Sequence, residues 1–205
     1  MEYFLEGFVL QASLIMALGA QNLFLIDIGI RKQHHFVAAF ICAICDLVLV
    51  LIGVAGLLLI VVKIPAFKTI VGVIGAGFLI YYAALKFRSF LHRDNLSIST
   101  SETVFTRNQV IKVALGFTLL NPHVYIDTIF LIGGYSAKFQ SLSDRLLLGF
   151  GAGSFSFVWF FSLVSFSSLF ANFLIKPKWN RLLSLITSIL LLYLGISLLV
   201  DSLMG

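Results

Sequence analysis

The sequence predicts an all-α integral membrane protein with six transmembrane helices, arranged as two inverted three-helix repeats. Three observations predict this fold class. Of the 205 residues, 60% are hydrophobic and only 11% are charged, against about 45–50% and about 25% in soluble domains. The hydrophobic residues form runs long enough to cross a hydrocarbon core of about 30 Å. The two halves of the chain also resemble each other.

Six runs carry few or no charges, and each is predicted to form one membrane helix. They are residues 7–30, 36–62, 69–85, 113–137, 146–175 and 182–200. A polar stretch rich in Ser and Thr follows the third run and predicts a flexible linker. The predicted organisation is a first repeat over residues 1–92, a cytoplasmic linker over residues 93–108 and a second repeat over residues 109–205.

Matching residues in the two halves predict the repeat. Pro65, Phe67 and Tyr81 around the third run correspond, at one constant offset, to Pro177, Trp179 and Tyr193 around the sixth. Three helices per half is an odd number, so the second half must enter the membrane from the opposite side. Such inverted repeats are typical of secondary transporters, with the substrate site near the bilayer midplane between the halves.

The positions of Lys and Arg predict the orientation and account for the net charge of +5. One side of the six-span arrangement carries ten of them: Arg31, Lys32, Lys86, Arg88, Arg93, Arg107, Lys112, Lys176, Lys178 and Arg181. The other side carries Lys63, Lys68, Lys138 and Arg145. The positive-inside rule places the richer side in the cytoplasm and both termini outside. A five-span arrangement, with one run at the interface, stays open. The basic residues lie between apolar runs, so no nucleic-acid partner is expected.

Three acids lie in apolar runs, where an ionised side chain costs at least about 2.5–3.5 kcal/mol and is a functional candidate. Asp46 and Asp127 can both approach the midplane, at about 15 Å and about 21 Å along their runs. Asp27 is nearer the cytoplasmic end, with Arg31 one helical turn away. A local ion pair would satisfy it.

Two predicted breaks in the helices accompany the acids. Residues 19–22, Gly-Ala-Gln-Asn, interrupt the first run, and Asn121-Pro122-His123 interrupts the fourth, where Pro122 removes an amide donor. Irregular backbone at membrane depth is tolerated where it is buried or lines a wet cavity. Half-helix ends there can hold a substrate carboxylate, while Gln21, Asn22 and Asn121 add donors and acceptors. The alternative is a simple proline kink, with Asn joining neighbouring helices.

Small residues on several predicted helices permit close helix approach. They are Gly72, Gly75, Gly77, Gly149 and Gly153. Such residues serve either packing within the fold or contacts between the protomers of a homodimer.

Five segments, in order along the chain, resemble the lysine/arginine exporter family, LysE, with its ArgO branch. They are Gly19-Ala-Gln-Asn-Leu-Phe, Gly29-Ile-Arg-Lys, Cys42-Ala-Ile-Cys-Asp-Leu, Asn121-Pro-His-Val-Tyr-Ile-Asp-Thr and Ser156-Phe-Val-Trp-Phe-Phe. The fourth segment is the most specific, because the related homoserine/threonine exporter branch usually has Asn-Pro-Lys there. Two residues depart from the family pattern: Ala20 stands where proline is common, and Asp27 where an acid is not typical.

The resemblance implies a multi-pass exporter of basic L-amino acids in the bacterial inner membrane, driven by the proton gradient or the membrane potential and needing no cofactor. The family's motif residues carry over to Gln21, Asn22, Asp46, Asn121, Pro122 and Asp127, and Tyr125 joins them as a substrate contact. Asp46 and Asp127 are also expected to couple transport to protons. Lipid surrounds such a protein, and its substrate is a small basic molecule.

Other function classes stay open at this point. The chain could export another small cationic or neutral amino-acid-like solute, or be a membrane assembly subunit without transport. An intramembrane aspartyl enzyme would need local signatures around Asp46 and Asp127 that this sequence lacks, so no enzyme activity is expected.

Overall fold

A computed structural model covers the chain and describes residues 1–16, 19–56, 65–91, 105–121, 124–125, 127–174 and 177–204. Over these residues the protein is helical and forms no strand. The elements are α1 (Glu2–Ile15), α2 (Ala20–Arg31), α3 (His35–Val54), α5 (Pro65–Leu91), α6 (Arg107–Leu119), the π-helix η1 (Asp127–Gly133), α8 (Gly134–Ser136), α9 (Leu142–Leu169), α10 (Ala171–Leu174) and α11 (Pro177–Met204). Many apolar side chains on the outer faces of α5, α9 and α11 are exposed, as expected where lipid is the solvent.

Four helices are long and apolar enough to cross a membrane. They are α3, α5 from Thr69 onward, α9, and α11 from Arg181 onward. A fifth span results if α1 and α2 are counted together. The described part of the chain thus provides four or five candidate spans. The six spans predicted from hydropathy stay a prediction, and the two runs missing from the four long helices are the first and the fourth, which the sequence predicts to be interrupted.

The first apolar run is a bent pair of helices. The axes of α1 and α2 differ by 82°, and Gly19 precedes α2 in an extended conformation. The break predicted at residues 19–22 is therefore confirmed at its first residue, because α2 begins at Ala20. Hydropathy cannot detect such a bend, since both arms are apolar.

The fourth apolar run is also divided. The helix α6 begins with a capping box, in which Thr106 and Gln109 bond each other's backbone amides, and it ends at Leu119. After the predicted break, η1 and α8 continue the run as short elements. Pro122 and His123 lie outside the described residues, so the kink assigned to Pro122 stays a prediction.

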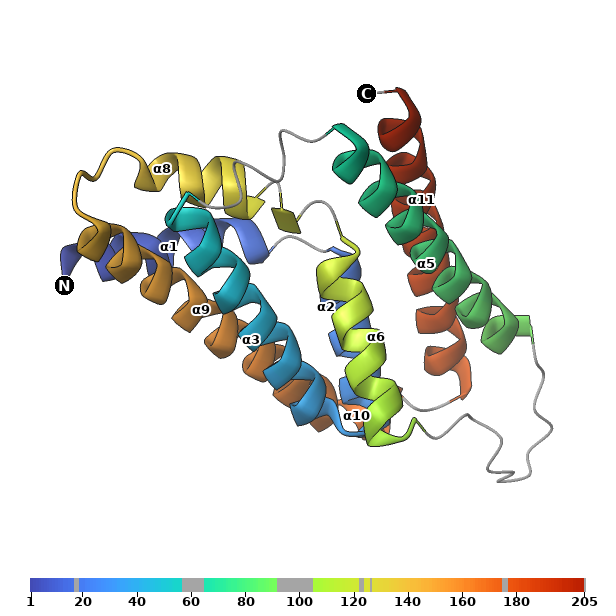
Figure 1. Cartoon of the computed structure of the whole chain (residues 1–205). Helices are drawn as coiled ribbons and strands as arrows, with labels where there is room; N and C mark the ends of the chain where they lie inside the picture. Colours follow the sequence, from blue (N-terminus) through green and yellow to red (C-terminus); the bar gives the residue numbers. More distant parts are fainter. Residues whose placement is uncertain are drawn as a thin grey trace.

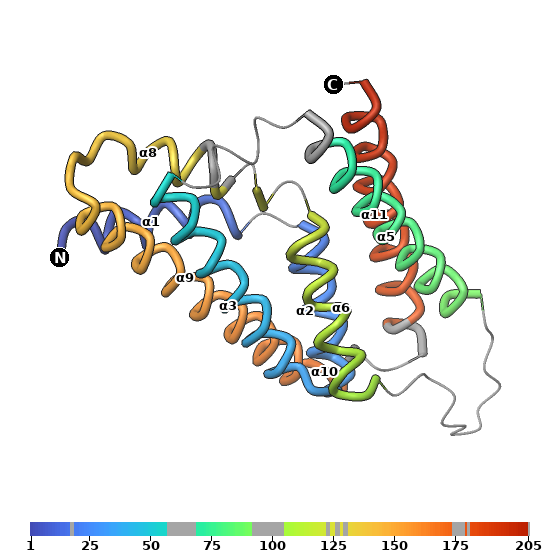
Figure 2. Tube along the Cα trace, viewed as in Figure 1, coloured from blue at the N-terminus to red at the C-terminus, as the bar shows by residue number. Residues whose placement is uncertain are grey.

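The elements pack as pairs that combine the two halves of the sequence. Figure 1 shows α2 and α6 between one pair formed by α3 and α9 and another formed by α5 and α11. The trace in Figure 2 shows α1 and α8 next to each other beyond the end of α3. There the hydroxyl of Tyr135 on α8 donates a hydrogen bond of 2.8 Å to Glu6 on α1.

The α1 and α9 helices approach each other closely through two glycines. A Cβ atom at Gly7 would overlap the backbone oxygen of Leu148, and one at Gly151 would overlap that of Phe4. Without side chains at these positions, the two backbones lie in direct contact along α1. This contact holds α1 on the fold although α1 is bent away from α2.

Most of the glycines singled out from the sequence face other helices of the same chain. Gly72 faces Ser202, and Gly75 faces the backbone of Leu120. Gly149 and Gly153 face side chains of α3. Gly77 has no atom of another element within 4 Å of the place its Cβ would take. Of the two interpretations of these glycines, packing within the fold holds for Gly72, Gly75, Gly149 and Gly153.

Candidate functional site

Asp46 lies in the interior, in the middle of α3, and is only 4% exposed. The side-chain amide of Gln11 on α1 donates to its Oδ2 at 2.8 Å. The hydroxyl of Ser156 on α9 donates to the same oxygen, and the amide of Gln11 also bonds that hydroxyl at 2.9 Å. Three helices from both halves of the chain therefore meet at this one carboxylate.

The hydrogen bonds of this cluster suit a carboxylate that can bind and release a ligand. A carboxylate accepts hydrogen bonds, and Gln11 and Ser156 are neutral donors that leave its charge in place. A buried charge is stable when it is hydrogen-bonded, and it attracts a cation or a proton strongly because the surroundings have a low dielectric constant. A carboxylate in such surroundings has the chemistry to bind either.

Gln11 and Ser156 were not among the residues expected from the sequence to form the site. Both are buried. A single uncharged polar residue in an apolar run is a weak signal, and several other Ser residues in α9 look the same in the sequence. What distinguishes Gln11 and Ser156 is that the helix pairing brings both to Asp46.

Asn22 joins the two arms of the bent first run. Its side-chain amide donates to the carbonyl oxygen of Ile15, near the end of α1, at 2.8 Å. The indole nitrogen of Trp159 on α9 donates to its side-chain oxygen at 3.3 Å. Asn22 thus satisfies a helix-end carbonyl that the break leaves without a partner, which is a structural role compatible with a place at the site.

Gln21, the neighbouring residue, connects the two interrupted runs. Its amide donates to the hydroxyl of Thr118 on α6 at 3.1 Å, and that hydroxyl in turn donates to the carbonyl of Ala114. All three residues are buried. The start of α2 and the end of α6 are therefore next to each other, as expected if the two breaks belong to one site.

The residues of the second break are only partly described. The hydroxyl of Tyr125 donates to the carbonyl of Leu119 at 2.8 Å, so Tyr125 caps the end of α6. Asn121 is half-buried. Pro122 and the side chain of Asp127 lie outside what the structure describes, and their assignments stay predictions.

The backbone of η1, which begins at Asp127, packs against the second half of α3. A Cβ at Gly53 of α3 would lie 2.9 Å from the backbone oxygen of Thr128. Gly53 is seven residues beyond Asp46, or about 10 Å along the helix at 1.5 Å per residue. The backbones that carry Asp46 and Asp127 thus belong to contacting elements.

Asp27 has two cationic partners. Its Oδ1 lies 3.3 Å from Nε of Arg31, which confirms the local ion pair expected from the sequence. Its Oδ2 lies 2.5 Å from Nζ of Lys86 on α5. The predicted third run ends at residue 85, which would leave Lys86 in the loop that follows, and this boundary is wrong: α5 continues to Leu91 and Lys86 is only 5% exposed.

Comparison with known proteins connects this arrangement to a family. The family model described as LysE type translocator matches residues 12–202. The chain is 34% identical over 184 residues to the arginine exporter protein ArgO of Yersinia enterocolitica, covering 89% of each chain. It is 31% identical over 197 residues to ArgO of Escherichia coli, covering 96% of this chain and 92% of the relative.

The similarity extends to a third relative and covers both breaks and Asp46. ArgO of Serratia proteamaculans is 32% identical over 188 residues, with 92% of this chain and 91% of the relative covered. The comparison with solved structures found no match. The matched family region contains all the helices from α2 to α10 and nearly all of α11. The chain therefore belongs to the LysE family of amino-acid exporters and is a multi-pass protein of the inner membrane.

Proposed function

We propose that this protein exports basic L-amino acids, arginine foremost and lysine with it, from the cytoplasm in exchange for protons. The observation that carries the proposal is the buried Asp46, held by Gln11 and Ser156 where α1, α3 and α9 meet, in a chain whose relatives over nearly its full length are named arginine exporters. An anionic group in the interior of an exporter favours a cationic substrate.

Two carboxylates and two helix ends fit the charges of a basic amino acid. Asp46 and Asp127 neutralise the substrate's amino group and its side-chain cation. The start of α2, next to Gln21, has backbone amides that lack partners within the helix, and such amides bind carboxylates. Asn121 and Tyr125 at the second break contribute further polar contacts.

Proton exchange follows from the same carboxylates. A proton on Asp46 or Asp127 removes the negative charge that holds the cation, so protonation from the outside favours release there. The return of the empty, protonated carrier then completes the cycle. No cofactor is required for these steps.

The contacts between elements support an inverted repeat that alternates access. In the first half, α1 and α2 pack on α9, while in the second half η1 and α6 pack on α3. The remaining large contacts are between equivalent helices, α3 with α9 and α5 with α11. Exchanging the halves therefore preserves the most extensive of these contacts, as a two-fold relation requires. Rocking of one half against the other then exposes the site to each side in turn.

Uptake of labelled amino acids by proteoliposomes tests the proposal. Vesicles containing the purified protein and loaded with arginine should exchange it for external labelled arginine and lysine, and an imposed proton gradient should drive net flux. Leucine and threonine serve as neutral competitors. If the vesicles exchange the neutral amino acids but not the basic ones, the proposal of a cationic substrate is refuted. If the proton gradient does not affect the exchange, the proposed coupling to protons is refuted.

The oligomeric state also belongs to this proposal. Gly77 remains a candidate for contact with a second protomer, because no atom of another described element lies within 4 Å of the place its Cβ would take. Cross-linking through a cysteine at position 77 would detect a homodimer.

A further inference from the structure

The ion pair between Asp27 and Lys86 joins two parts of the fold that otherwise meet mostly through apolar side chains. Asp27 is near the end of α2, and Lys86 is in the last two turns of α5. The α5 helix packs mainly along α11, and this two-helix unit contacts the rest of the protein less extensively, through α2, α6 and α10. The pair therefore links the α5–α11 unit to the body that contains Asp46.

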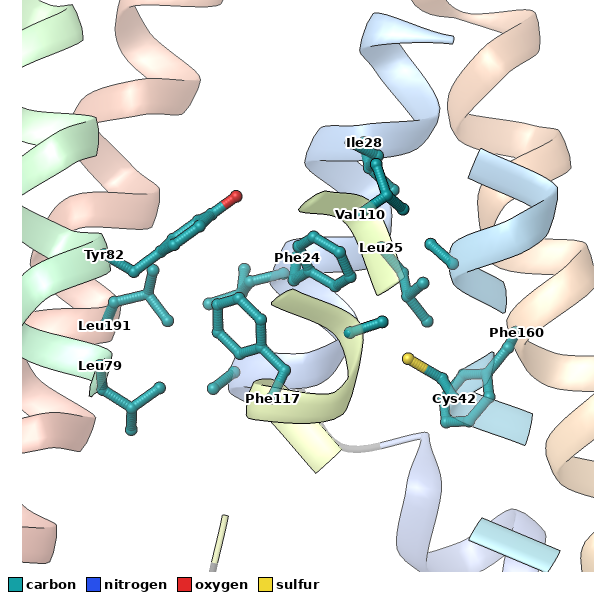
Figure 3. Close-up of a cluster of buried hydrophobic side chains, with 14 of the residues drawn as sticks. Phe24, Leu25, Ile28, Cys42, Leu79, Tyr82, Val110, Phe117, Phe160 and Leu191 are labelled. Atoms are coloured by element: carbon teal, nitrogen blue, oxygen red, sulfur yellow. The ribbon is translucent and has the colours of Figure 1, made fainter. Parts of the chain in front are cut away.

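Several aromatic rings lie in the rest of this interface. Figure 3 shows Tyr82 reaching from α5 toward Phe24 on α2 and Phe117 on α6. The ring centroids of Tyr82 and Phe117 are 4.9 Å apart, those of Phe24 and Phe117 4.8 Å, and Phe78 of α5 also contacts Phe117. Less free energy is needed to slide such rings past one another than to separate an ion pair whose members find no new partners.

The groups around Asp27 that hold the ammonium of Lys86 would also suit the cation of a ligand. The ammonium of Lys86 lies 5.5 Å from the centre of the Tyr82 ring, within the range of cation–π attraction, which arginine side chains also use. The hydroxyl of Tyr82 is buried and has no hydrogen-bond partner among the described residues. A ligand with N–H groups at Asp27 would meet a carboxylate, an aromatic face and a hydroxyl oxygen together.

The carboxylate of Asp27 is also the more accessible partner. Its side chain is 16% exposed, against 7% for that of Lys86. Asp27 lies five to six residues beyond Gln21 and Asn22, about 8 Å along α2 toward its cytoplasmic end. A substrate moving from the cytoplasm to the break would pass it.

We propose that Lys86 is a tethered counter-ion that occupies Asp27 in the substrate-free carrier and that the side-chain cation of an entering basic amino acid replaces it, which frees the α5–α11 unit from α2. The inference rests on the proposed function and adds a cytoplasmic substrate site and the event that opens it. Arg31 stays on Asp27 throughout, so the carboxylate is not left bare during the exchange. A guanidinium has the advantage over the ammonium of Lys86 that it can bond both carboxylate oxygens.

The alternative is a purely structural ion pair. Buried pairs are often no more stabilising than apolar residues of the same size, while loss of one partner is costly. A structural role thus predicts that removing Lys86 lowers stability and leaves substrate affinity unchanged. The proposal predicts tighter binding, because an internal competitor has been removed.

Binding of labelled arginine to the purified, full-length protein separates the two. If Lys86 occupies Asp27 in about nine-tenths of empty carriers, Lys86→Met should lower the Kd for arginine by about tenfold. Lys112→Met, which removes an exposed lysine of α6, is the matched control and should leave the Kd unchanged. Asp27→Asn should weaken binding, and Lys86→Met should give no further tightening in that background.

One further variant keeps the test decisive. Lys86→Arg retains a cation and should bind arginine like the unsubstituted protein. The combination of Asp27→Asn with Lys86→Met removes both members of this pair, and Arg31 is then the one charged group left of the three. Spin labels on cysteines at Lys32 and Arg88 should move apart on addition of arginine, and in Lys86→Met should be apart without it.

The outcomes distinguish this inference from the proposed function. If the unsubstituted protein binds and exports arginine but Lys86→Met has the same Kd, the counter-ion role is refuted and the proposed function stands. If the unsubstituted protein neither binds nor exports arginine, both are refuted. A tighter Kd in Lys86→Met with no change in the distance between the labels would refute the release of the α5–α11 unit.

Discussion

The amide nitrogen of Gln11 lies 2.8 Å from Oδ2 of Asp46 and 2.9 Å from the hydroxyl oxygen of Ser156, so one side chain of α1 bridges α3 and α9. Asp46→Asn keeps the size of this residue but cannot carry the charge that a cationic substrate needs. We expect net arginine export to fall by at least about tenfold, since loss of a partner from a buried charge pair costs about 2–5 kcal/mol. Efflux from arginine-loaded cells measures this.

Asp27→Asn serves as the comparison for Asp46→Asn, because Arg31 and Lys86 give Asp27 ionic partners within the protein. Its effect on export should be milder. Export should be compared per molecule of protein in the membrane, because Asp27→Asn also leaves Lys86 and Arg31 without their carboxylate. Export by Asp46→Asn at the rate of the unsubstituted protein would show that this carboxylate does not carry the substrate or the proton.

Gln11 and Ser156, which donate hydrogen bonds to Asp46, should themselves contribute to stability and export. Gln11→Leu removes the hydrogen bonds that Gln11 donates to Asp46 and Ser156 and should destabilise the protein by about 1–3 kcal/mol, as expected when a buried acceptor loses its donor. Export should fall with it. Thermal unfolding in detergent and efflux from cells measure the two effects.

Ser156→Ala should act in the same direction, and Ser154→Ala is its control. Ser154 lies on the same helix but donates only to the carbonyl of Phe150, in its own helix. Equal effects of the two Ser substitutions would argue against a special role for the bond between Ser156 and Asp46.

The contact between α1 and α9 predicts a steep dependence on side-chain size. Gly151→Val places atoms where the backbone of Phe4 lies and should separate the helices, at a cost of about 1–3 kcal/mol or more. A Cβ at Gly77, in α5, would meet none of the described residues within 4 Å, so Gly77→Val should be tolerated in the monomer. Folded yield by size-exclusion chromatography compares the two. A well-folded Gly151→Val protein would mean that α1 does not pack on α9 at this distance.

The orientation can be tested at connections that the structure describes. In a background without Cys42 and Cys45, a cysteine at Gln33 between α2 and α3 should react only with reagents that enter the cytoplasm. One at Ser141, before α9, should react from outside. Labelling of position 33 by an impermeant reagent in intact cells would reverse the orientation. A cysteine at Glu2 then shows whether the first run, α1 with α2, crosses the membrane.

Composition and hydropathy were sufficient to predict a helical membrane protein, and the polar positions in apolar runs led to Asp46, Gln21 and Asn22. The small and polar residues 19–22 also predicted the break in the first run, but hydropathy did not reveal the angle of 82° between α1 and α2. Hydropathy ended the third run at residue 85, because a charge at Lys86 looks like the start of a connection. Only the packing of α5 beside α2, which brings Lys86 to Asp27, makes its burial favourable, and a sequence does not reveal a partner 59 residues away.

The division of the first apolar run has a consequence for how the protein is made. With 14 residues, α1 is about 21 Å long, and α2 with 12 residues is about 18 Å, so neither arm alone reaches across about 30 Å of hydrocarbon. The backbone surface that receives α1 belongs to α9, which leaves the ribosome more than 130 residues later, about 7–26 seconds at the usual rate of synthesis. During this interval Gln11 lacks Ser156, and α9 is not present to hold α1 beside Asp46. The helix α1, although made well before α9, therefore reaches its final position only after the second half of the protein has been synthesised. Until then it must stay at the membrane surface or within the insertion machinery.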